Sequence, residues 1–213
     1  MSSALPEPAV VLALYREGVD AFVWLAGQAA TDDAWDRPAC GVWSGADLVR
    51  HELDVIGWYH GWLDRALDGD PSPAFDIEVI DERTDAGVRA LAHVSPEDAA
   101  ARFATEAERY AERLEPNWDL PFGYPRGTVT AGLHAGLAAS EWHLHAWDLA
   151  RALGTDHRPS DPAALVVAAW ACMAAAQGTR IELEQSLAQI AARTFPWDTL
   201  LTSSGRRAAG RTS

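Results

Sequence analysis

Cysteine is scarce in this chain: Cys40 and Cys172 are the only two among 213 residues. They lie far apart and form no CxxC motif, so the sequence offers neither a disulfide framework nor the ligand pattern of a zinc ribbon. We expect both side chains to be reduced, packed thiols.

Basic residues are also few. Seventeen Lys and Arg stand against 31 Asp and Glu, which gives a formal net charge of −14. A charge of this sign repels polyanions, so we expect neither nucleic acid nor an anionic membrane surface as a partner. A small-molecule substrate or a protein partner remains.

Long hydrophobic runs are missing as well. No segment approaches the roughly eighteen uninterrupted apolar residues that a transmembrane helix requires. The first eight residues have neither the basic region nor the apolar region of a secretory signal. We therefore expect a cytoplasmic protein.

Strand patterns of period two are absent from the sequence, whereas apolar residues recur at steps of three and four. A hydrophobic content of 48% is ample for a buried core. The fold class predicted is all-α, a helical bundle with accessory helices. Residues 117–127 read as an irregular connection, and the tail from Ser203 as frayed. The expected helices are 8–30, 45–67, 80–92, 96–114, 128–154, 162–178 and 181–194.

The helix predicted near the middle of the chain carries a pair of metal-ligand side chains. Glu141 and His145 are four residues apart, so they project from one face about one turn apart. Such a pair also arises often as a simple helix-surface interaction. His51 lies on the apolar stripe of another helix, with Val55 and Trp58, where a histidine is commonly a satisfied core residue.

Two helices of a bundle can bring these three side chains together. His51, Glu141 and His145 would then form a set of two histidines and one carboxylate with a position left open. An open set is the catalytic type for zinc, and nickel, manganese or ferrous iron accept the same ligands. His51 and Glu52 begin an HExxH pattern, but Val55 stands at its last position, which excludes a zincin protease site.

Four further ionisable side chains lie on the same two predicted helices as the candidate ligands. His134 and Asp148 lie seven residues before and after Glu141, with a small angular offset, so both could line a pocket. Asp148 suits the orientation of a ligand imidazole, and pairing with Arg151 explains it equally well. His143 and His60 point away from the proposed ligands and are interpreted as surface or packing residues.

Two motifs resemble those of a known family. W-S-x-x-D-L-x-x-H ends at His51, and E-x-x-x-H-A-W-D-L-A-R-A-x-G runs from Glu141 to Gly154. Together they resemble the DinB-like, mycothiol-dependent maleylpyruvate isomerase family of metal-binding proteins, over residues 8 to 155. The resemblance implies a DinB-like four-helix bundle and a divalent metal, zinc in the isomerase, held by His51, Glu141 and His145.

The resemblance also implies that the metal activates a low-molecular-weight thiol, chiefly mycothiol, for reaction with a small electrophile. The isomerase carries a separate C-terminal domain, whereas residues 156–213 here read as C-terminal helices packing on the bundle and a flexible tail. The expected function is therefore a thiol-dependent transferase or isomerase. The alternatives are a hydrolase-like enzyme that uses metal-bound water, with Asp148 or His134 as base, and a non-catalytic metal- or ligand-binding bundle. Exposed bundle faces would allow a homodimer.

Overall fold

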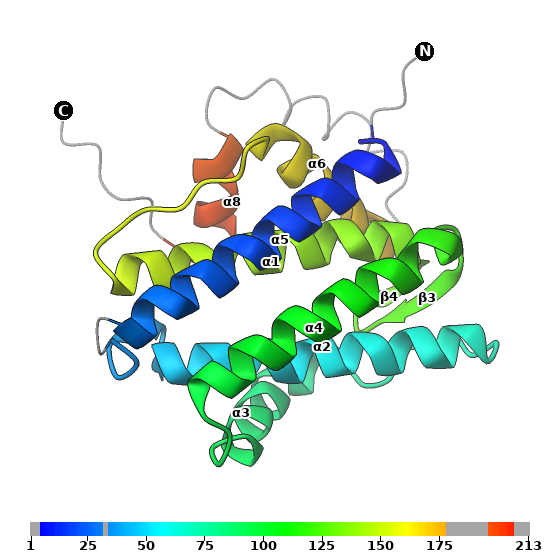
Figure 1. The fold of residues 1–213 in the computed structure, drawn as a ribbon. Helices are drawn as coiled ribbons and strands as arrows, with labels where there is room; N and C mark the ends of the chain where they lie inside the picture. Colours follow the sequence, from blue (N-terminus) through cyan, green and yellow to red (C-terminus); the bar gives the residue numbers. More distant parts are fainter. Residues whose placement is uncertain (1–4, 32–33, 178–195, 207–213) are drawn as a thin grey trace.

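The computed structural model of the protein describes residues 5–31, 34–177 and 196–206. Its main helices are α1 (Pro8–Thr31), α2 (Gly45–Leu67), α4 (Pro96–Leu114) and α5 (Ala131–Ala152). In Figure 1, α1 and α4 cross in front of α5 and α2, and α1 packs against both α4 and α5 while α2 packs against α4. The fold class is all-α and DinB-like, as predicted.

Shorter helices extend this bundle. A 3₁₀ turn (Ile77–Val79) leads into α3 (Ile80–Ala90), which packs on α2, and a second 3₁₀ turn (Glu115–Asn117) follows α4. After α5, α6 (Pro162–Ala176) packs on α5, and α8 (Pro196–Ser203) packs on α6. The helix predicted over 181–194 lies outside the described residues. No described helix is long and apolar enough to cross a membrane.

Helix starts follow the local sequence closely. Ser44 caps α2 in a capping box with Asp47, and Ser95 caps α4, with Pro96 in its first turn. Both starts agree with the prediction. For α5, the expected start at residue 128 is wrong by three positions, because Thr130 is the N-cap and residues 127–130 form a strand.

Two antiparallel hairpins correct the expectation that the chain has no strands. β1 (Pro38–Cys40) pairs with β2 (Trp43–Ser44), and β3 (Pro121–Tyr124) pairs with β4 (Gly127–Thr130). Each strand has at most four residues, too few to show an alternating pattern. The turn of the first hairpin uses Gly41 at φ 57°, and β4 of the second hairpin begins with Gly127 at φ 152°.

Aromatic side chains fill the centre between the main helices. Trp142 of α5 is fully buried, and its ring centroid lies 5.0 Å from that of Phe103 and 5.9 Å from that of Tyr15. The buried Tyr15 hydroxyl donates to the Ala107 carbonyl of α4 at 3.0 Å. This packing fixes α5 against α1 and α4, and thereby the direction of its polar face.

Candidate metal site

His51 is positioned by the start of α2 and by the hairpin before it. The capping box at Ser44 fixes the first turn of the helix, and His51 follows two turns later, buried. The ring of Trp43, from β2, lies 4.6 Å from the His51 ring, centroid to centroid. An indole against the imidazole limits the orientations that the His51 ring can take.

Glu141 and His145 lie on the face of α5 that is turned toward His51. Nε2 of His145 is 3.3 Å from Oε1 of Glu141, and the ring centroids of His145 and His51 are 5.2 Å apart. One ligand atom from each of the three residues lies within 4.8 Å of the others. The structure thus brings together the three side chains that the sequence singles out.

This arrangement fits a divalent metal ion. Ligand atoms bound at about 2.1 Å to one ion lie roughly 3 to 4 Å from each other, and the 3.3 Å between Nε2 of His145 and Oε1 of Glu141 falls in this range. Nδ1 of His51 is buried and has no hydrogen-bond partner among the described residues. Two imidazoles and a carboxylate match the donor preferences of zinc, nickel, manganese and ferrous iron.

The electrostatics of the three side chains differ. Burial, together with the charge of His145, lowers the pKa of His51 to about 3, so its ring is neutral. Burial raises the pKa of Glu141, but the hydrogen bond and charge of His145 outweigh it and bring the value to about 2. Burial acts to lower the pKa of His145, yet the surrounding carboxylates, Glu52 first, hold it well above its usual value. A metal ion bound through Nε2 would therefore have to displace a proton from His145.

Asp148 bonds to the imidazole of His145. Its Oδ2 lies 3.0 Å from Nδ1 of His145, and both side chains are buried. The sequence left open whether Asp148 orients a ligand imidazole or pairs with Arg151, and the structure shows the contact with the imidazole. The guanidinium of Arg151 lies over the Trp147 ring instead. Asp148 thus leaves Nε2 of His145 as the nitrogen facing Glu141.

Arg206 also reaches this carboxylate, although nothing in the sequence pattern indicates it. Its Nη2 is 2.6 Å and its Nε 2.9 Å from the two oxygens of Asp148. The same Nη2 is 3.8 Å from Sγ of Cys40. Cys40, His145 and Asp148 also place ligand atoms within 4.8 Å of one another. The guanidinium of Arg206 supplies a positive charge beside this second cluster.

His134 makes its direct contacts with aromatic side chains and not with the three candidate ligands. Its Nδ1 is 3.1 Å from the Tyr110 hydroxyl, and its ring centroid lies 4.4 Å from those of both Tyr59 and Phe122. Burial lowers the pKa of His134 to about 3, so the ring is a neutral member of an aromatic cluster.

The two histidines expected to point away from the site do so. Nε2 of His143 is 2.9 Å from the Leu14 carbonyl and its Nδ1 is 2.8 Å from His157, so it joins α5 to α1 and is buried rather than exposed. His60 lies between α2 and α4, where its Nδ1 is 2.9 Å from Nη1 of Arg113.

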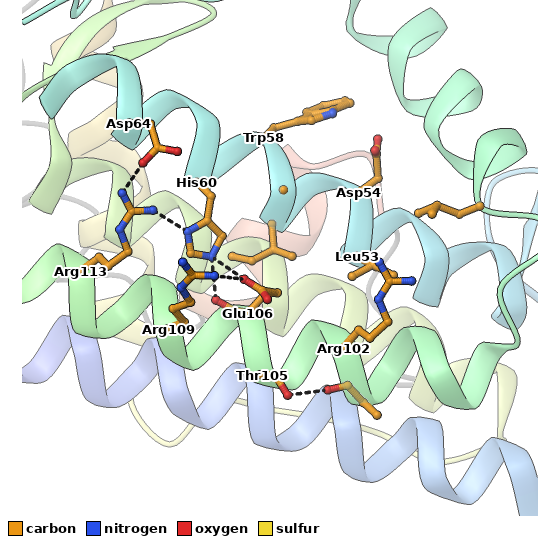
Figure 2. Close-up of a pocket in the computed structure, with 14 residues that line it drawn as sticks. Leu53, Asp54, Trp58, His60, Asp64, Arg102, Thr105, Glu106, Arg109 and Arg113 are labelled. Atoms are coloured by element: carbon orange, nitrogen blue, oxygen red, sulfur yellow. Dashed lines mark hydrogen bonds and ion pairs between the residues drawn. The ribbon is translucent and has the colours of Figure 1, made fainter. Parts of the chain in front are cut away.

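A groove of about 670 Å³ lies on that side of α2, lined by residues of α2 and α4 and by Leu91. Figure 2 shows its lining side chains. Asp54, Trp58 and His60 contribute to it, and Arg102, Arg109 and Arg113 face them from α4. None of the three candidate ligands is part of its lining. The groove and the candidate metal site are therefore separate features of α2.

Glu52 is, with Arg206, a side chain near the site to which the sequence pattern assigned no role. It is fully buried, and its Oε1 lies 4.0 Å from Nε2 of His145. Burial raises its pKa to about 8. In the sequence, Glu52 stands out only as part of an incomplete HExxH pattern. The signal was its position among the apolar residues Leu48, Val49 and Ile56, at helical spacing, where a carboxylate needs a reason to be buried.

The family model for the mycothiol maleylpyruvate isomerase N-terminal domain matches residues 7–150. No curated protein and no solved structure matches the chain. The matched region covers α1 to α5 up to residue 150, including His51, Glu141 and His145. Because this match spans more than half of the chain, the protein belongs to the mycothiol maleylpyruvate isomerase N-terminal domain family, the family that its motifs resemble.

Proposed function

We propose that the protein is a divalent-metal, low-molecular-weight-thiol-dependent transferase or isomerase acting on a small electrophile. His51, Glu141 and His145 would hold the ion, with zinc as the expected metal and mycothiol as the expected thiol. The observation that carries the proposal is the convergence of three ligand atoms from two helices within 4.8 Å. Membership of a mycothiol-linked family supports the choice of thiol.

A bound ion would supply Lewis-acid chemistry, because a divalent metal lowers the pKa of a thiol and stabilises the thiolate. The chain's own residues prepare the site for it. Asp148 orients His145 through Nδ1, and Arg206 holds Asp148 in place. Trp43 packs against the ring of His51. Glu141 is partly exposed, with 34% of its side-chain surface accessible, so the site is open to small molecules on that side.

The hydrolase alternative needs a free base beside the ion, and neither candidate is well placed for that role. Asp148 already bonds to both His145 and Arg206. His134 has its Nδ1 at the Tyr110 hydroxyl and aromatic rings around it. We therefore favour the thiol-dependent reaction over water-driven hydrolysis.

We also propose that residues 1–155 form the metal-binding bundle and that residues 156–213 add C-terminal helices and a tail. The packing of α6 on α5 supports the expectation that the C-terminal helices lie against the bundle. A homodimer stays a prediction, to be checked by light scattering of the purified protein.

Metal analysis of the purified protein tests the proposal first. We expect one divalent ion per chain in the wild type, loss of that ion in His51→Ala, and retention in the control His93→Ala, whose ring is exposed. Absence of a stoichiometric ion after loading with zinc, nickel, manganese or ferrous iron would rule out both metal-dependent functions.

A conjugation assay with a model electrophile then tests the thiol requirement. We expect product only when mycothiol or another small thiol is added, and no product with His51→Ala. Turnover in the absence of thiol would favour the hydrolase alternative. A metal-loaded protein that is inactive with every thiol would favour the non-catalytic bundle.

A further inference from the structure

Glu52 is a buried acid that accepts no hydrogen bond in the described part of the chain. Its side chain is fully buried on α2, next in sequence to His51. Neither Oε1 nor Oε2 has a hydrogen-bond partner among the described residues. An ionised carboxylate is among the most costly groups to bury unless a cation or hydrogen bonds compensate it.

The charges around Glu52 show what is missing. Three carboxylates, from Glu52, Glu141 and Asp148, surround the imidazole of His145. The guanidinium of Arg206 is bound to Asp148 by three contacts of 3.0 Å or less and so neutralises that acid. The carboxylates of Glu52 and Glu141 remain, and both lie beside Nε2 of His145.

A divalent ion at Nε2 would carry the two positive charges that balance this pair when both acids are ionised. We propose that Glu52 is the second anionic group of the metal site, so that an ion held by His51, Glu141 and His145 is neutralised by Glu141 and Glu52 together. The inference rests on the proposed metal-binding function. It assigns to this chain a fourth site residue that the two family-like motifs do not contain, since W-S-x-x-D-L-x-x-H ends one residue before it.

The 4.0 Å between Oε1 of Glu52 and Nε2 of His145 places this charge within reach of an ion at Nε2. At such a distance in a water-poor interior, a carboxylate acts strongly on a cation whether or not it enters the first coordination sphere. Glu52 therefore favours divalent over monovalent cations and strengthens binding of the ion.

Two variants of Glu52 and one matched control test the inference. Glu52→Gln removes the charge and keeps the shape, and Glu52→Met replaces the carboxylate with an apolar side chain suited to a buried position. Asp54→Asn is the control, because Asp54 lies on the same helix but lines the separate groove of Figure 2. The measurements are zinc affinity by chelator competition and melting temperature with and without zinc.

We expect zinc affinity about 10-fold to 100-fold weaker in both Glu52 variants, and wild-type affinity in Asp54→Asn. Zinc should raise the melting temperature of the Glu52 variants less than that of the wild type, while their metal-free melting temperatures stay equal or rise. Wild-type zinc affinity in both Glu52 variants would overturn the inference and leave the proposed function intact. A wild type that binds no divalent ion would instead overturn the proposed function, and this inference with it.

Discussion

At the scale of single residues, the candidate site depends on how His145 is held. One ring nitrogen faces Glu141 and the other bonds to Asp148, which is itself bound by Arg206. A chain of contacts of this kind fixes the tautomer and the ring angle of a ligand before the ion arrives. The affinity for metal should therefore depend on Asp148, although its side chain need not contact the ion.

Asp148→Asn tests this dependence. The amide keeps the size of the side chain but loses the negative charge that faces Nδ1 of His145 and Arg206. We expect metal affinity to fall about 10-fold to 100-fold, measured by chelator competition. Asp156→Asn is the control, because the Asp156 side chain is 63% exposed. Equal affinities in the two variants would show that Asp148 does not orient the ligand.

The three candidate ligands could be chosen from the sequence because each is an ionisable residue at helical spacing on a patterned face. Asp148 was ambiguous, since the same spacing allows contact with either His145 or Arg151. Arg206 could not be found this way. Its contact with Asp148 spans 58 residues, and no local periodicity encodes a contact of that range. Glu52 does have a signal in the sequence, namely its position among apolar residues at helical spacing. That signal is separate from the incomplete HExxH pattern.

At the scale of helices and strands, prediction succeeded where caps and periodicity agree. The bounds of α2 and α4 follow from Ser44, Ser95 and the apolar stripes between caps. The two hairpins were not predicted, because glycine residues and packing against helices specify their pairing. Their strands do not show an alternation of apolar and polar residues. Strand β1 packs against α5, and that contact, which is set by tertiary structure, brings Cys40 near His145.

The contact between α5 and α6 relies on the absence of a side chain at Gly136. A Cβ there would lie 2.7 Å from Cβ of Ala168 and 2.9 Å from its backbone carbonyl, closer than atoms pack. We expect Gly136→Ala to lower the free energy of unfolding by about 1 to 3 kcal/mol, measured by urea denaturation.

Gly61→Ala is the matched control for that variant. Gly61 also lies inside a helix, α2, but a Cβ there would meet nothing within 4 Å. Alanine should therefore stabilise the protein by about 0.5 to 1 kcal/mol, through lower backbone entropy in the unfolded chain. If Gly136→Ala is as harmless as Gly61→Ala, then α6 does not pack on α5 as tightly as described.

At the scale of the whole molecule, the fold keeps its buried histidines uncharged, apart from His145, which carboxylates surround. Burial is the main cause that lowers the pKa of His134 to about 3, against an ordinary value of 6.5. In the unfolded chain this ring takes up a proton as the pH falls through 6.5, whereas in the folded protein it does so only near pH 3. Stability from neutral His134 is therefore complete above pH 6.5 and is lost progressively between pH 6.5 and 3.

His134→Gln should remove this part of the pH dependence. Between pH 7 and pH 4.5, we expect the wild type to lose about 2 to 3 kcal/mol more unfolding free energy than the variant, by urea denaturation at each pH. His93→Gln, at an exposed position, should follow the wild-type curve. Parallel curves for wild type and His134→Gln would mean that His134 is not kept neutral by the fold.

The bond between Arg206 and Asp148 also bears on the order in which the protein is made. Asp148 leaves the ribosome 58 residues before its guanidinium partner. During that interval a nascent bundle already contains His51, Glu141 and His145, but the carboxylate behind His145 is not yet neutralised. Translation of Arg206, which follows α8, thus neutralises Asp148 only after all the candidate ligands have been synthesised. It sets the earliest moment at which the carboxylate behind His145 has its cationic partner.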